Sequence, residues 1–140
     1  MQFQRSTDYA IRILHYLYSH ESLSTASTIS EAINISYPKF IEIATQLRKH
    51  GLLTSEQGRN GGYRLAKPAR TIRLYDVFLA MEGEAALSHC LGSEEPCSWS
   101  AGSHCAIREY FRETQEAMIE WLSARYIADL DKLIPHRHDT

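Results

Sequence analysis

All three cysteines of the 140-residue chain fall in one stretch, which reads HCLGSEEPCSWSAGSHC from His89 to Cys105. Six residues separate Cys90 from Cys97 and seven separate Cys97 from Cys105, in a segment rich in Gly, Ser, Pro and Glu. Thiolates are preferred ligands of iron–sulfur clusters, and a loop allows several of them to converge on one cluster. Three clustered cysteines also fit metal ligation or redox chemistry better than a disulfide framework. The stretch therefore predicts a cysteine-ligated metal or redox site.

Three thiolates leave one ligand position open on a 4Fe–4S or 2Fe–2S cluster. His89 and His104 adjoin cysteines and are local candidates for that position. A structural zinc site is an alternative, since zinc accepts three Cys and one His, although the usual C-x2-C knuckle is absent. A metal-free thiol switch is a further alternative, because an oxidisable cysteine regulates by forming a disulfide.

The composition is that of one ordinary globular domain, with 44% apolar and 23% charged residues. No run of apolar residues is long enough to span a bilayer, so we expect no membrane association. The first residues, MQFQRSTDYA, lack the apolar core of a signal peptide, and we expect a cytoplasmic protein. The chain contains no P-loop, no HExxH and no dinucleotide fingerprint, and an enzyme is therefore not expected.

The small net charge of -2 conceals an asymmetry between the two halves of the chain. Residues 1–75 hold ten Lys and Arg against five Asp and Glu, whereas residues 76–140 hold five against twelve. A basic half joined to an acidic half is typical of a nucleic-acid-binding unit attached to a second module.

The first element that the pattern predicts is a helix over residues 7–20. Ser6 or Thr7 is suited to cap it, and Asp8 lies in the first turn, where a negative charge favours the helix dipole. Apolar residues recur on one face at steps of three and four, namely Ala10, Ile13, Leu14 and Leu17.

A helix-turn-helix is predicted next. Thr28 and Glu31 have capping-box spacing and open a short helix that ends near Ile33. Ser36 is suited to cap a second helix, which ends at Gly51. A short helix, a tight turn and a second helix form the DNA-reading pattern. The outward-facing polar residues that we expect to contact DNA from the second helix are Ser36, Tyr37, Lys39, Glu42 and Gln46.

A β-hairpin follows the second helix, as in a winged helix. The predicted strands are Leu52–Gln57 and Tyr63–Ala66, joined by a basic, glycine-rich tip that reads GRNGG. Arg59, Asn60 and Arg64 are expected to enter a minor groove, whose negative potential attracts arginine. For Arg64 the alternative is a surface salt bridge.

The second half is predicted to be mainly helical. A short helix over residues 76–82 ends at Gly83, and a helix of roughly 25 residues follows the cysteines. Pro135 is expected to stop this long helix before a frayed tail. The long helix needs a partner surface because its apolar stripe is broad, comprising Ile107, Tyr110, Phe111, Thr114, Met118, Trp121, Leu122, Tyr126, Leu130 and Leu133.

Five stretches occur in the order found in one known family. They are STDYAIRILHYL, LRKHGLL, GRNGGYRLAKPA, IRLYDVFLAMEG and the three-cysteine stretch. With them the chain resembles the IscR–NsrR–RirA family of bacterial winged-helix repressors, within the Rrf2 superfamily. The resemblance implies a homodimer whose long C-terminal helices cross and place two winged helices on a palindromic operator in double-stranded DNA. It also implies a cysteine-ligated iron–sulfur cluster whose state sets DNA affinity.

The resemblance adds a candidate for the open ligand position. Asp8 stands where the nitric-oxide-sensing branch of the family has an aspartate, which reaches the cluster of the partner subunit. The alternative is an ordinary acidic residue at a helix start. The cysteine spacing of six and seven differs from the branches, so the signal remains open among nitric oxide, iron supply and redox state.

We therefore expect a mainly α fold with a small β-hairpin wing, in which a winged helix-turn-helix precedes a long C-terminal dimerisation helix. The expected divisions are a DNA-binding domain at 1–83, a cysteine segment at 84–106, a dimerisation helix at 107–134 and a flexible tail at 135–140. The expected function is that of a transcriptional regulator, acting as a repressor.

Overall fold

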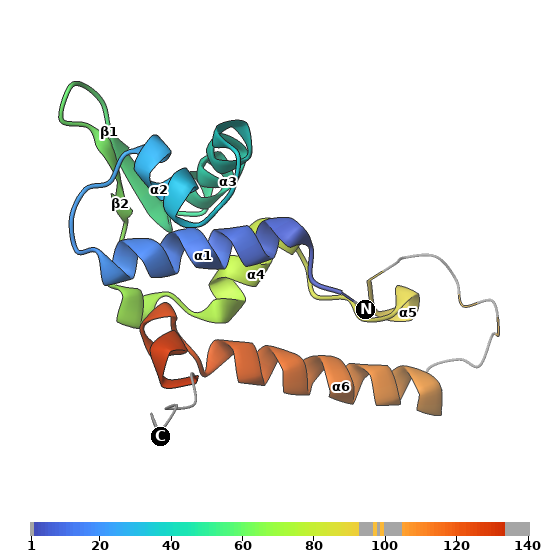
Figure 1. Ribbon diagram of the computed structural model, residues 1–140. Coiled ribbons are helices and arrows are strands. Elements are labelled where there is room, and N and C mark those ends of the chain that lie inside the picture. The colour runs from blue at the N-terminus through green and yellow to red at the C-terminus, as the bar shows by residue number, and fades with distance from the viewer. Residues whose placement is uncertain (1, 93–96, 98, 100–104, 134–140) are drawn as a thin grey trace, which may run out of the picture.

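The computed structural model describes residues 2–92, 97, 99 and 105–133 of the chain (Figure 1). Its architecture is mainly helical with one two-stranded antiparallel hairpin, as the sequence predicts. The elements run in the order α1 (Arg5–Ser19), α2 (Ala26–Ala32), α3 (Tyr37–Lys49), β1 (Leu53–Glu56), β2 (Gly62–Leu65), η1 (Ala69–Thr71), α4 (Leu74–Glu82), α5 (His89–Gly92), α6 (Ala106–Ser123) and η3 (Ile127–Leu133).

The core lies where α1, α3 and α4 pack together, with α2 and the hairpin on one side (Figure 1). The predicted apolar face of α1 is buried there, together with one face of α3. These faces meet because apolar residues spaced by three and four align on one side of a helix. The largest fully buried side chains include Ile13, Leu14, Ile29, Phe40, Ile43, Leu47, Ile72 and Val77.

The start of α1 differs from the prediction. The helix begins at Arg5, and Gln4 occupies the cap position without a side-chain bond, so neither Ser6 nor Thr7 is the cap. The carboxylate of Glu82, the last residue of α4, takes this role instead. It accepts hydrogen bonds from the Gln4 N–H and from Thr7 Oγ1, each at 3.0 Å. A residue distant in the chain thus accepts the N–H of the cap residue and the Thr7 hydroxyl, which local sequence rules cannot reveal.

The caps of the helix-turn-helix were predicted correctly for one helix only. The Ser36 Oγ accepts a bond from the Lys39 N–H at 3.3 Å and begins α3 as expected. The cap of α2, however, is Thr25 and not Thr28, because the Thr25 Oγ1 accepts the Thr28 N–H at 3.2 Å. Both threonines are suitable cap residues, but only Thr28 has Glu three positions later, so the capping-box spacing indicated the wrong one.

The hairpin is the predicted wing, with slightly shorter strands. Leu53 lies opposite Leu65 in the ladder, and Glu56 lies opposite Gly62. The tip requires glycine, since Gly58 has a φ of 104° and a Cβ on Gly61 would overlap the backbone of Glu56. The wing is also tied to the chain ahead of α2 by an isolated bridge between Ser24 and Tyr63.

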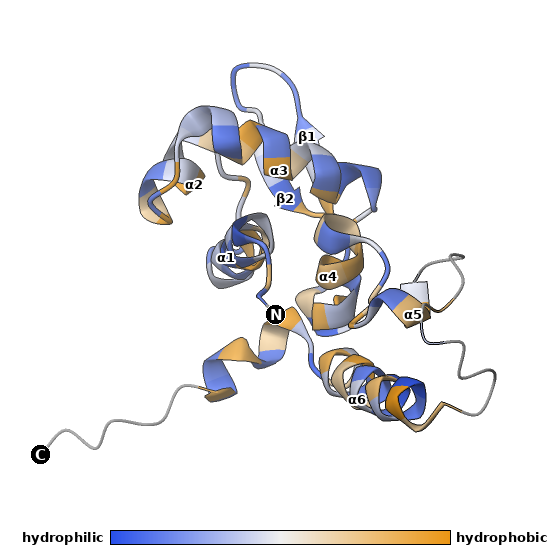
Figure 2. Cartoon of the chain, turned by 90° about the vertical axis from the view of Figure 1, so that its right-hand side faces the viewer, coloured by the Kyte–Doolittle hydropathy of each residue, from blue (hydrophilic) through white to orange (hydrophobic). Residues whose placement is uncertain are grey.

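The helix after the cysteines is shorter than predicted. α6 ends at Ser123, 18 residues from its start, and the chain then turns into the 3₁₀ segment η3. The helix stops because Tyr126 pairs with Arg73 in an isolated antiparallel bridge, which draws the backbone back toward α4. Figure 2 shows α6 beneath α4, away from α2 and α3. Pro135 and the predicted tail lie outside the described residues.

Across the described part of the chain, no helix combines the length and the apolar character that crossing a bilayer requires.

Candidate nucleic-acid interface and cysteine segment

The recognition helix α3 buries one face and presents the other to solvent. Tyr37 is 52% exposed, and Ser36, Glu42 and Gln46 are exposed as well. Lys39 is half-buried, and its Nζ lies 3.3 Å from the carboxylate of Glu42. This i,i+3 pair is solvent-accessible and contributes little to stability. A DNA phosphate can therefore compete with Glu42 for the lysine.

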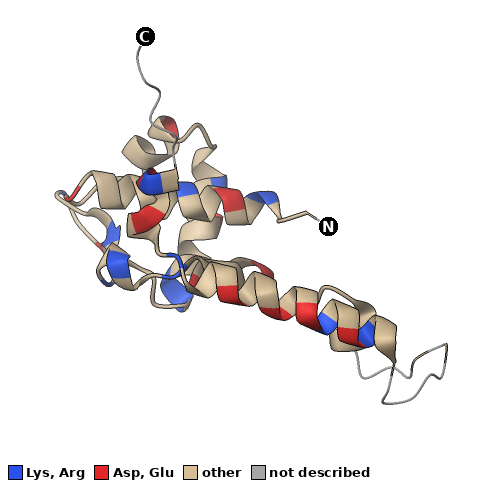
Figure 3. Ribbon diagram, turned by 90° about the horizontal axis from the view of Figure 1, so that it is seen from below, with Lys and Arg blue, Asp and Glu red and all other residues tan. Residues whose placement is uncertain are grey.

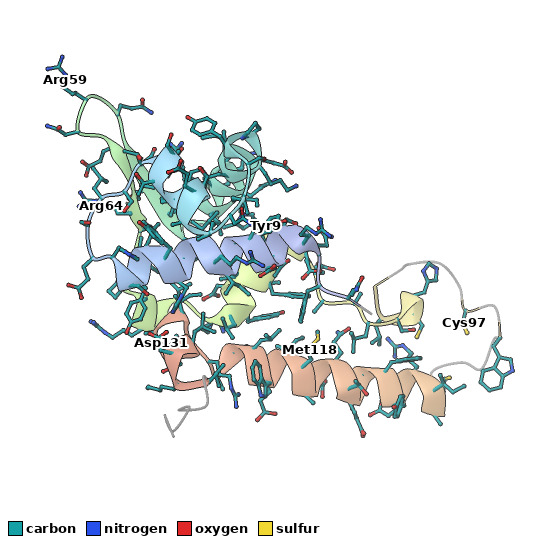
Figure 4. The ribbon with its side chains drawn as sticks, in the orientation of Figure 1. Tyr9, Arg59, Arg64, Cys97, Met118 and Asp131 are labelled. Carbon is teal, nitrogen blue, oxygen red and sulfur yellow. The ribbon has the colours of Figure 1, made fainter. Side chains whose placement is uncertain are left out.

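The tip of the wing carries its basic residue away from the body. Arg59 and Asn60 are exposed, and Figure 4 shows Arg59 extending outward from the hairpin. Arg64 lies farther down the wing, where its Nη2 contacts Glu56 Oε1 at 2.8 Å. The alternative considered for Arg64, a surface salt bridge, is thus present. Both side chains are 53% exposed, so this pair also remains open to competition from phosphate.

The wing and the recognition helix are held together by an aromatic contact. The ring of Phe40 in α3 meets the ring of Tyr63 in β2 edge to face, with centroids 5.1 Å apart and planes at 84°. Such an arrangement is the favoured geometry of aromatic pairs. The contact fixes the position of the wing relative to the outward face of α3.

A basic hollow between α3 and β1 was missed by the sequence prediction. It has a volume of about 560 Å³ and borders the last turns of the recognition helix. The sequence LRKHGLL indicated only a helix end, although its adjacent Arg and Lys were the available signal. The hollow combines two cationic side chains with three hydroxyl groups, and its lining comprises Thr45, Arg48, Lys49, Leu53, Thr54 and Ser55.

Two of the three cysteines lie on neighbouring elements. Cys90 is in α5, and Cys105 is the N-terminal cap residue of α6. The Nε of Arg108, in the first turn of α6, donates to the carbonyl of Cys90 at 3.4 Å and links these elements. Both cysteines are half-buried, whereas Cys97 is exposed. Figure 4 shows Cys97 at the end of the molecule opposite the wing tip.

The candidates for a further ligand lie in different places. His89 is exposed on α5 next to Cys90, whereas His104 lies outside the described residues. Asp8 is in the first turn of α1, and Arg12 donates to its carboxylate through Nε at 3.0 Å and Nη2 at 2.8 Å. The Nη1 of Arg12 also donates to the carbonyl of Ile33, which ends α2, at 3.4 Å.

The chemistry of the donor set suits a soft metal site. Three thiols favour iron–sulfur clusters or zinc over hard cations such as magnesium. Within the described residues of this single chain, no three His, Cys, Asp or Glu side chains are grouped to hold a metal ion. The thiols thus fit such a group by chemical type, although the described residues of one chain do not assemble the site.

α6 carries an acidic face and an apolar face, both exposed. Figure 3 shows acidic residues recurring along α6, which include Glu109, Glu113, Glu116 and Glu120. Arg112 bonds to Glu109 and Glu116, and these bonds raise the pKa of its guanidinium. The apolar residues exposed on the helix are Ile107 at 50%, Tyr110 at 66% and Trp121 at 45%.

Comparisons with known proteins agree with this arrangement. The family model Rrf2, described as an iron-dependent transcriptional regulator, matches residues 3–132. Protein aau3 of Rhizobium meliloti is 32% identical over 136 residues, which cover 96% of this chain and 88% of that protein.

Two solved structures share the fold. CymR (YrzC), the global cysteine regulator of B. subtilis, superposes with a TM-score of 0.78 at 24% identity and covers 96% of this chain and 99% of its own. IscR of T. potens superposes with a TM-score of 0.73 at 23% identity, with coverages of 94% and 87%. The match over nearly the whole chain places it in the Rrf2 family, whose members are winged-helix, DNA-binding transcriptional regulators and not enzymes.

Proposed function

We propose that this chain is a homodimeric repressor whose affinity for a palindromic operator is set by an iron–sulfur cluster. Cys90, Cys97 and Cys105 would ligate that cluster, of the 4Fe–4S or 2Fe–2S type. The observation that carries the proposal is the docking of α5 on the first turn of α6 through Arg108, which brings the elements bearing Cys90 and Cys105 together. The thiols adjoin the helix that we assign to dimerisation, so a change at the thiols acts on the dimer.

The DNA-reading assignments follow from exposure and charge. The outward residues of α3 are positioned for a major groove, and those of the wing for the flanking minor groove. Gln46 is suited to an adenine edge, while Lys39 is suited to a phosphate or a guanine edge. The residues assigned to DNA are Ser36, Tyr37, Lys39, Glu42, Gln46, Arg59, Asn60 and Arg64.

The assignment of a homodimer rests on the exposed apolar face of α6. Among the 18 residues of this helix, all of which the structure describes, only Leu122 is buried. Ile107, Tyr110 and Trp121 are exposed along this helix, where a second copy of the helix would cover them. We call the winged helix-turn-helix of each chain, residues 1–83, its reading unit. Two reading units joined in this way match the two halves of a palindromic operator.

The fourth ligand is assigned to the partner subunit's Asp8. When bound, the cluster supplies a group that is sensitive to oxidants, nitric oxide and iron supply. Within one chain, the carboxylate of Asp8 is held by Arg12, which also bonds to the carbonyl of Ile33 at the end of α2. If Asp8 ligated a metal, its carboxylate would leave Arg12. The bond from Arg12 to the carbonyl of Ile33, which connects α1 to the helix-turn-helix, would then change. The cluster and the operator then affect each other's binding reciprocally.

Anaerobic purification followed by visible absorption and assays of iron, sulfide and zinc tests the cluster. We expect a coloured protein with iron and acid-labile sulfide, and loss of both in the Cys97→Ser variant. Stoichiometric zinc without colour would identify a structural zinc site and contradict the proposal. A metal-free protein that binds DNA according to its thiol oxidation would identify a thiol switch instead.

Substitution of Asp8 tests the fourth ligand. The Asp8→Ala variant is expected to change the absorption spectrum while remaining a folded dimer, whereas the control Glu21→Ala retains the wild-type spectrum. An unchanged spectrum in Asp8→Ala would reassign the position to His89 or His104.

A further inference from the structure

α6 is followed by a return segment, residues 124–133, which runs back along the body of the chain (Figure 1). The N–H of Leu74 donates to the carbonyl of Arg125 at 2.9 Å. The N–H of Ile127 donates to the carbonyl of Ile72, also at 2.9 Å. These two bonds flank one pair of facing residues, as in an antiparallel ladder. They fix both the position and the direction of the chain that leaves α6.

Buried side chains reinforce the backbone pairing. Ile127 and Ile72 are fully buried, at 0% exposure each, and lie on the two paired stretches. Leu122, the buried residue of α6, is 8% exposed and lies one turn before the pairing begins. The C-terminal end of α6 is therefore the end that is packed into the core of the reading unit.

The 3₁₀ part of the return segment is attached to α1. The Oδ1 of Asp131 lies 2.8 Å from the Nε2 of His15, and Figure 4 shows Asp131 between η3 and α1. The segment is also braced internally, because the Tyr126 N–H donates to Asp129 Oδ2 at 3.1 Å. Asp129 accepts a further bond from Lys132 Nζ at 2.9 Å. The segment is thus attached at two places, to residues 72–74 through residues 125–127 and to α1 through Asp131, and two attachments oppose its rotation.

We propose that the return segment determines the spacing of operator half-sites that the dimer accepts. This inference rests on the proposed homodimer and adds a specificity element to it. In the proposed dimer the two α6 helices cross at a fixed angle. If each α6 is rigidly joined to its own reading unit, that angle fixes the distance between the two α3 helices. Without such a joint, α6 would still pack on α4, but each reading unit would be freer to turn relative to the dimer interface.

The geometry of DNA makes spacing sensitive to this joint. One base pair changes the separation of two half-sites by about 3.4 Å and their relative rotation by about 34°. A dimer with fixed reading units cannot follow both changes without losing contacts in one half-site. A dimer with released units can follow them, because each unit reorients on its own half-site.

Insertion of two glycines between Ala124 and Arg125 in the full-length protein tests the proposal. The insertion lengthens the joint while α6 and residues 125–133 each keep their sequences. The control has the same two glycines directly after Leu133, beyond the return segment. The probes are duplexes that the wild-type protein selects from a random DNA pool, resynthesised with half-site spacings changed by one and two base pairs.

We expect wild type and control to lose about tenfold or more in affinity for each altered spacing. The insertion variant should bind the native spacing more weakly and discriminate among spacings by less than about threefold. Wild-type discrimination in the insertion variant, shown to be a folded dimer by circular dichroism and light scattering, would overturn the inference. A one-glycine variant at the same place should be intermediate. Failure of both variants to fold would assign the segment to folding rather than positioning and would likewise contradict the proposal.

The proposed function fails separately from this inference. A wild-type protein that is monomeric, or that selects single half-sites, would contradict the homodimeric repressor itself. A dimeric wild type that selects palindromes, with an insertion variant of equal spacing discrimination, would contradict only the role of the return segment.

Discussion

At the scale of single residues, the pair of Arg73 and Asp76 holds the junction between the wing and α4. Asp76 accepts the Arg73 N–H at 2.9 Å and the Arg73 Nη2 at 2.7 Å. Burial acts to raise the pKa of Asp76, but the bonds from Arg73 outweigh it and hold the pKa below its ordinary value. Arg73 is also the residue that faces Tyr126 in the bridge to the return segment. Ionised Asp76 therefore stabilises the junction of the wing, α4 and the return segment.

Replacing Asp76 by Asn should make the free energy of unfolding less dependent on pH in the acid range. The folded-state pKa lies below the unfolded value of about 3.9, so the ionised carboxylate stabilises the fold above that pH and loses its effect as the pH falls through the folded pKa. We expect Asp76→Asn to unfold in less urea at pH 7 and to show a smaller loss between about pH 5 and pH 2. Glu84→Gln, an exposed control, should follow wild type. Parallel curves for wild type and Asp76→Asn would contradict the assignment.

Arg59 belongs to the same scale, because at a minor groove flanked by phosphates its guanidinium would also neutralise one phosphate charge. Removal of one such contact lowers the slope of log affinity against log salt concentration by about 0.9 per site. We expect Arg59→Ala to weaken binding to selected and random duplexes alike and to reduce the slope by about one per subunit. Arg70→Ala, on η1, is the matched control. Equal affinity of Arg59→Ala and wild type at all salt concentrations would remove the wing tip from the interface.

At the scale of elements, the first three helices begin on two kinds of cap. α2 and α3 use their own Thr25 and Ser36, whereas α1 uses the carboxylate of Glu82 from α4. The partner of that carboxylate, Thr7, is 4% exposed. α1 and α4 are consequently joined at the turn that carries Asp8, one residue beyond Thr7.

Removal of this distant cap should cost stability of the order seen for ordinary caps. We expect Glu82→Ala to lower the free energy of unfolding by about 1 kcal/mol and to speed amide exchange in the first turn of α1. Thr7→Val should reproduce part of the effect, and Thr7→Ser, which keeps the hydroxyl, should not. Additive losses in the Glu82→Ala, Thr7→Val double variant would show that the two side chains act independently.

At the scale of the whole molecule, the reading unit has a buried core of its own, whereas α6 leaves large apolar side chains exposed. One side of this helix packs on α4 through Leu122, and its outer side leaves Tyr110 and Trp121 exposed. Arg125 stacks over the Trp121 ring at 3.9 Å from its centroid. An apolar face of this length is typical of an interface between subunits.

A charge on the outer side of α6 should separate the subunits. We expect Tyr110→Glu to convert the proposed dimer to a monomer in light scattering, because an unpaired carboxylate would be buried in the proposed interface. The monomer should bind a single half-site with the weak affinity of one reading unit. Glu113→Ala, on the acidic side of α6, should remain dimeric. A dimeric Tyr110→Glu protein would place the interface elsewhere.

Most features that depend on near neighbours could be predicted from the sequence, although the cap of α2 is Thr25 and not the predicted Thr28. The cap at Ser36, the glycine-rich tip at Gly58 and the end of α4 at Gly83 all use residues within a few positions of one another. The apolar spacing likewise identified the buried faces of α1 and α3, because helical periodicity is a local property.

Features that join distant residues depend on the packing of the whole chain. The cap of α1 comes from Glu82, and the end of α6 follows from pairing between residues 72–74 and 125–127. The continuous apolar spacing predicted one long helix, since residues 126, 130 and 133 fit its stripe whether the chain continues or turns back. Local propensity cannot make that choice, because the free energy that ends the helix comes from bonds to a stretch some fifty residues earlier.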